Sequence, residues 1–75
     1  MTLRQYLGEH TEVTSVDYTY HAKDGNIECN YVTREDILNG SWEIPDGIAD
    51  CETVEYLGTE TFGSNDVVAY VNVKA

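Results

Sequence analysis

The chain has 75 residues, of which 14 are acidic and 4 are lysine or arginine, so its formal net charge is −10 at pH 7. This length allows one domain, residues 1–75. The charge argues against direct binding to nucleic acid or to an anionic membrane, because contacts with phosphates require lysine and arginine. Apolar residues make up 41% of the chain, which is typical of a folded domain and not of a disordered one.

The first predicted element is a short helix over residues 2–9. Leu3, Tyr6 and Leu7 fall on one helical face, and Thr2 can cap the first turn. Gly8 is expected to end the helix. A helix this short is not stable alone, so we expect it to pack on a sheet.

A β-hairpin is predicted next. Residues 16–21 alternate apolar and polar side chains, which indicates a half-buried strand. Asp24-Gly25 predicts a tight turn, and residues 27–32 form the return strand. One face of that strand carries Ile27, Cys29 and Tyr31.

The second half repeats this layout without repeating the sequence. Residues 33–39 predict a second short helix, and residues 41–49 a connection. A second hairpin follows, with strands at 51–58 and 67–73. The last strand is almost continuously apolar, which favours a central position in the sheet or cover on both faces.

The element order is therefore α-β-β-α-β-β. It predicts an α+β fold with a four-stranded, mainly antiparallel sheet of two hairpins and two short helices on one face.

The two cysteines, Cys29 and Cys51, are 22 positions apart and belong to no C-x-x-C pair. We expect two small buried strand residues; a disulfide and a metal or redox role remain alternatives. Together with His10 and His21 the thiols match the ligand count of a zinc site but lack its closely spaced pairs. No metal and no cofactor are expected.

Catalysis is not expected either. The sequence contains no nucleophile elbow, no phosphate-binding loop and no dinucleotide-binding fingerprint. Residues 1–10 do not resemble a signal peptide, and no apolar run approaches the roughly 20 residues that span a bilayer. We therefore expect a cytoplasmic protein.

The most unusual feature is a window without lysine or arginine between Arg34 and Lys74. Its acidic side chains form either an ordinary solvated surface or an array of carboxylates presented to a basic partner. The second interpretation is favoured because surfaces normally mix both signs of charge. The candidate partner-binding residues are Glu43, Asp46, Asp50, Glu52 and Glu55, with Trp42 and Tyr56 as apolar anchors. For Trp42 the alternative is a side chain that caps the core.

In size and charge the chain resembles the small acidic proteins of phages and mobile elements, some of which inhibit nucleases or other nucleic-acid-binding proteins by imitating the charge of DNA. The resemblance is one of composition and rests on no motif. The sequence thus favours a non-catalytic protein that binds a basic protein surface. The alternative is a structural protein that forms a homodimer through its sheet, with the charge serving solubility. A small enzyme or ligand-binding domain would require a closed polar pocket.

Overall fold

The predicted first helix forms as α1 (Leu3–Glu9) in the computed structural model, which describes residues 1–41 and 43–75. A capping box begins it: the Thr2 hydroxyl accepts a hydrogen bond from the Gln5 backbone N–H at 3.1 Å, and the Gln5 side chain accepts one from the Thr2 N–H at 2.8 Å. The helix continues past Gly8 and ends at Glu9. Leu3 and Leu7 are fully buried beneath it.

The first hairpin pairs β1 (Ser15–His21) with β2 (Ile27–Thr33) in antiparallel orientation. Its turn contains three residues, because the Ala22 N–H donates to the Asn26 carbonyl at 2.9 Å. Gly25 has a φ of 92°, which a side chain would disfavour.

The second half contains α2 (Arg34–Asn39), β3 (Val54–Phe62) and β4 (Asp66–Lys74). Within the predicted connection lies an unpredicted 3₁₀ turn, η1 (Ile48–Asp50), and the Cys51 N–H closes it by donating to the Ile48 carbonyl. The strand predicted at 51–58 therefore begins three residues later than expected.

The sheet has the order β2-β1-β4-β3 and is mixed. Both hairpins are antiparallel, as predicted, but the central strands β1 and β4 are parallel. Thr14, just before β1, fixes the start of this pair: its N–H donates to the Val67 carbonyl at 2.9 Å, and its hydroxyl accepts from the Val67 N–H at 3.0 Å. The apolar strand β4 thus occupies a central position.

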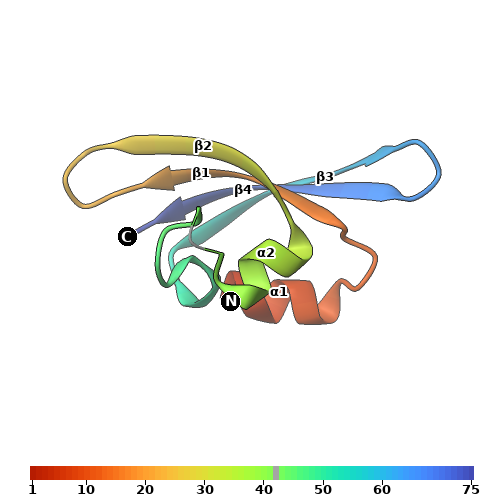
Figure 1. The fold of residues 1–75 in the computed structure, drawn as a ribbon, viewed down its shortest axis with the longest axis horizontal. Helices are drawn as coiled ribbons and strands as arrows, with labels where there is room; N and C mark the ends of the chain where they lie inside the picture. Colours follow the sequence, from red (N-terminus) through yellow and green to blue (C-terminus); the bar gives the residue numbers. More distant parts are fainter. Residues whose placement is uncertain (42) are drawn as a thin grey trace.

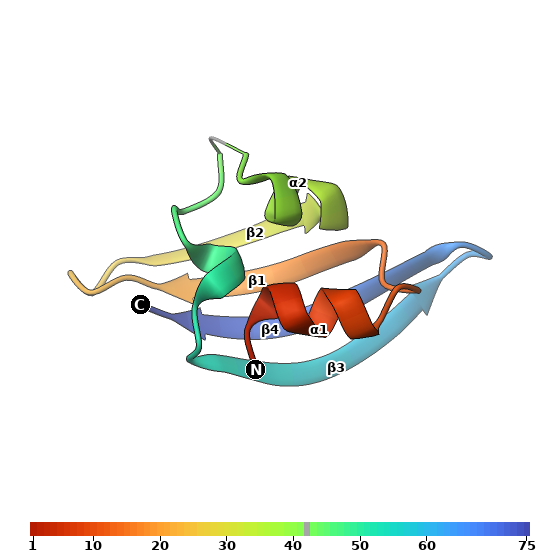
Figure 2. The same cartoon turned by 90° about the horizontal axis from the view of Figure 1, so that it is seen from below.

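All helices lie on one face of the sheet (Figure 1). Seen from that side, α1 lies over the central strands and α2 lies beside β2 (Figure 2). The core fills the space between helices and sheet; its fully or nearly fully buried side chains include Leu3, Leu7, Val13, Val16, Tyr18, Ile37, Ile48, Val71 and Val73. In the described part of the chain, no helix is long and apolar enough to cross a membrane.

Candidate functional site

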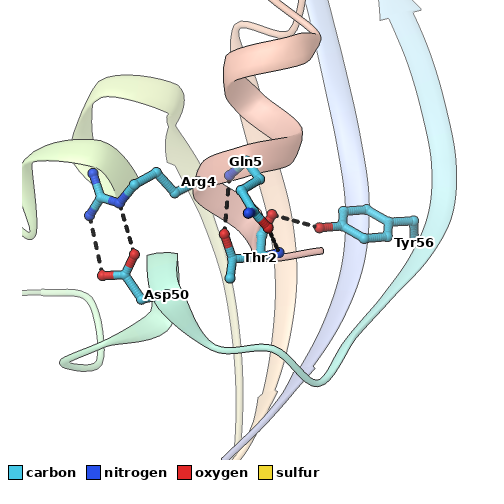
Figure 3. A network of polar contacts seen from close by, with 5 residues as sticks. All are labelled: Thr2, Arg4, Gln5, Asp50 and Tyr56. Carbon is cyan, nitrogen blue, oxygen red and sulfur yellow. Dashed lines mark hydrogen bonds and ion pairs between the residues drawn. The ribbon is translucent and has the colours of Figure 1, made fainter.

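Asp50 is held in an ion pair at the end of η1. The Arg4 guanidinium on α1 donates to both Asp50 carboxylate oxygens, at 2.9 and 3.5 Å (Figure 3). This hydrogen bond, with a smaller contribution from charge attraction, lowers the pKa of Asp50 below its ordinary value. Both side chains remain exposed, so the pair orients Asp50 more than it stabilises the fold.

Replacing Arg4 with glutamine should raise the pKa of Asp50, as measured by NMR titration of its carboxyl carbon. Because the folded-state pKa is depressed, the pair adds stability above the unfolded pKa of Asp50, and this is lost as the pH falls through the folded value. The Lys23→Gln variant is the control, since it removes the same charge without touching Asp50. An equal rise in both variants would contradict a specific pair.

Tyr56, predicted as an apolar anchor, points toward the helices from β3. Its hydroxyl donates to the carbonyl of Thr2 at 3.1 Å (Figure 3). The hydroxyl also donates to the Met1 carbonyl at 3.2 Å, and the ring stacks on Tyr6 with centroids 4.5 Å apart. Burial raises the pKa of Tyr56, and Tyr6 adds to the rise. The side chain therefore fastens β3 to the start of α1. The other predicted anchor, Trp42, lies outside the described residues.

The remaining predicted acids are exposed but do not form one array. Glu43 and Asp46 line shallow grooves beside the β1–β2 turn, where Asp24 is their neighbour. Glu52 and Glu55 line a different open groove of about 580 Å³ at the other side of the sheet, and Glu55 accepts a hydrogen bond from the Asn72 side chain at 3.1 Å. Asp50 ends η1 and Glu52 follows it, so both lie before β3 begins at Val54. Their carboxylates therefore do not project from one face of a strand.

The sheet face turned away from the helices brings together side chains that the sequence did not place on one surface; among them, Glu55 was predicted to bind a partner. We call it the open face; its side chains include Asp17 and Tyr70 on the central strands and Cys29, Tyr31, Glu55 and Glu60 on the edge strands. The strand register places Asp17 directly between Tyr31 on β2 and Tyr70 on β4. The hydroxyl of Tyr70 donates to Glu60 at 3.0 Å, and this bond is the main cause that raises the pKa of Tyr70; Asp17 and Tyr31 add smaller contributions.

The open face is also apolar at its margins. Ile27 is 61% exposed, Tyr31 58% and Phe62 49%. Such large exposed side chains on one face are a common mark of an interaction surface. The sequence pattern predicted that Ile27 and Tyr31 lie on the same face of their strand. It did not show whether that face is turned toward the helices or away from them.

The cysteines differ from expectation. Cys29 was expected to be buried but is exposed on the open face, where the Thr19 hydroxyl lies 3.7 Å from its sulfur. Cys51 is half-buried and donates from its sulfur to the Lys74 carbonyl at 2.7 Å. Both thiols are free, so the disulfide alternative is not realised. Among residues 1–41 and 43–75, no group of three or more His, Cys, Asp or Glu side chains is placed to hold a metal ion.

No protein-family model, curated protein or solved structure matches the chain.

Proposed function

We propose that this chain is a non-catalytic interaction protein that binds a basic protein surface. The observation that carries the proposal is the state of its carboxylates. Every acidic residue except Asp17 is exposed, and in the described part of the chain only Asp50 and Glu12 are within ion-pair distance of a basic group, Glu12 only of His10. The net charge of −10 is thus largely uncompensated at the surface and available to a cationic partner.

A nucleic-acid-binding protein is the partner class that fits this charge best. Its binding cleft is lined with lysine and arginine that neutralise phosphates, and carboxylates can replace those phosphates. The protein would then act in the cytoplasm as an inhibitor that competes with nucleic acid, in the manner of small phage or mobile-element proteins.

A homodimer through the sheet is the second candidate, and the geometry of β2 favours it. This edge strand is unpaired on its outer side, regular along its length, and carries exposed Ile27 and Tyr31. Unprotected edges of this kind pair readily with another strand. Self-repulsion of two chains at −10 each opposes such pairing.

The proposed function predicts that captured partners are released by salt and by duplex DNA. The immobilised protein would be exposed to a host lysate at low salt and then eluted, in separate runs, with a salt gradient and with DNA. We expect basic proteins whose apparent affinity falls about tenfold or more between roughly 50 and 200 mM salt, because the contacts are ionic. Partners released by neither eluent would contradict the proposal.

The alternative has its own signature in the same buffers. A homodimer that serves assembly would sediment as a concentration-dependent dimer whose stability is unchanged or increased by salt, because salt screens the repulsion between the two chains. Such a result, together with no basic protein in the eluates, would favour the second candidate.

A further inference from the structure

The open face is one side of a four-stranded sheet, and no helix among the described residues covers it (Figure 1). Exposed apolar side chains stand on both edge strands, with Ile27 and Tyr31 on β2 and Phe62 on β3. Between them the central strands contribute polar groups. An uncovered face with apolar margins and a polar centre has the anatomy of a surface that receives a partner.

Asp17 is the unusual group on this face. It is the one acidic residue of the chain that is partly buried, and it has no basic group within ion-pair distance among residues 1–41 and 43–75. Its neighbours across the strands are the two tyrosines, Tyr31 and Tyr70. A cationic group of a partner placed between the two tyrosines would therefore meet a carboxylate that has no ion-pair partner within the described residues.

Two more carboxylates, Glu55 and Glu60, lie on the face, and Lys74 shares it at the end of β4. Glu60 is held by the Tyr70 hydroxyl at 3.0 Å, and Glu55 by the Asn72 amide at 3.1 Å. Both carboxylates retain free oxygen lone pairs after accepting one hydrogen bond each. The open face therefore presents three carboxylates and two phenol rings, and its lysine, Lys74, lies at the end of β4 in the groove that Glu55 lines.

We propose that the open face is the docking surface for an arginine-bearing segment of the basic partner, with Asp17 as the acceptor of one guanidinium. This inference rests on the proposed function and assigns its site. A guanidinium offers a planar fork that matches a carboxylate bidentately, and its faces stack on aromatic rings. Asp17 supplies the carboxylate, and Tyr31 and Tyr70 supply the rings on either side.

Charge complementarity selects this occupant over a second copy of the chain. Two open faces brought together would gather the carboxylates of Asp17, Glu55 and Glu60 from both copies in one interface. Like charges brought together at an interface are strongly unfavourable. The exposed side chains of Ile27 and Phe62 would then contact apolar residues that flank the arginine in the partner.

The test uses a synthetic peptide in which arginines alternate with apolar residues, titrated into the full chain and followed by calorimetry and by backbone amide shifts. We expect the largest shifts on β1 and β4. Asp17→Asn should weaken binding about tenfold, whereas Glu35→Gln, the same loss of charge on α2, should change it less than about twofold. Tyr31→Ala should weaken binding and Tyr31→Phe should retain it, because the ring and not the hydroxyl makes the stacking contact. A lysine version of the peptide should bind several-fold more weakly.

Three outcomes would overturn the assignment. Equal effects of Asp17→Asn and Glu35→Gln would mean that only the total charge is sensed; the proposed function would then survive without this site. No binding of the peptide would reject the site, while elution of lysate partners by salt still reports on the proposed function separately. Self-association that is lost in Tyr31→Ala would give the face to a second copy. Circular dichroism of each variant checks that the fold is intact.

Discussion

Replacing Val71 with aspartate should remove a large part of the protein's free energy of unfolding at neutral pH. Val71 is 2% exposed at the middle of β4, with Tyr18 of β1 and Tyr56 of β3 as its register partners. A carboxylate there would be buried with no cation beside it, which costs on the order of 4 kcal/mol or more. A domain of this size has a free energy of unfolding of about 4–11 kcal/mol. Far-UV circular dichroism and a urea titration would measure the loss.

The matched control is Asn72→Asp, which adds the same charge at the next position. Asn72 lies on the open face, and its substitution removes the hydrogen bond to Glu55 and places two carboxylates together. We expect a cost of about 1–2 kcal/mol and a folded protein. Similar losses in the two variants would mean that the two sides of β4 do not differ as the register indicates.

The elements that the sequence predicted are those governed by local chemistry. Thr2 and Thr33 accept hydrogen bonds from the first turns of α1 and α2, and Gly40 adopts the left-handed conformation, with a φ of 67°, at the end of α2. Each of these depends on a few neighbouring residues. The order of elements could therefore be predicted.

The parallel contact between β1 and β4 could not be predicted in this way. It joins residues more than fifty positions apart, such as Val16 and Ala69. No turn residue or local pattern specifies which strands of two hairpins become neighbours. The short turn η1 was missed for a similar reason, since Ile48 and Ala49 adopt it while packing into the core.

The open face could not be predicted because the turn of the first hairpin is one residue longer than a two-residue turn at Asp24-Gly25. A two-residue turn at Asp24-Gly25 would pair His21 with Glu28, whereas the three-residue turn pairs His21 with Ile27. A shift of one residue moves every side chain of a strand to the other face. The turn therefore decides that Cys29 and Tyr31 are exposed and that Tyr31 stands beside Asp17.

Replacing Leu7 with alanine should lower the free energy of unfolding by about 2–5 kcal/mol. Leu7 is fully buried where α1 packs on the sheet, so the substitution removes apolar contacts and leaves a cavity. In a domain of this size the melting temperature should fall by roughly 10 °C or more. Calorimetry or a thermal melt followed by circular dichroism would measure the change.

Leu57→Ala is the same substitution at a site that solvent reaches. Leu57 is 58% exposed at the irregularity in β3, between Tyr56 and Gly58, and we expect a change within about 0.5 kcal/mol. A loss as large as that of Leu7→Ala would mean that Leu57 is covered in solution. Because nothing in the described chain covers it, the cover would have to be another molecule, and the loss would then depend on protein concentration. If the protein is a monomer with an accessible β3, Leu57→Ala should lower the free energy of unfolding only slightly, and by the same amount at every protein concentration.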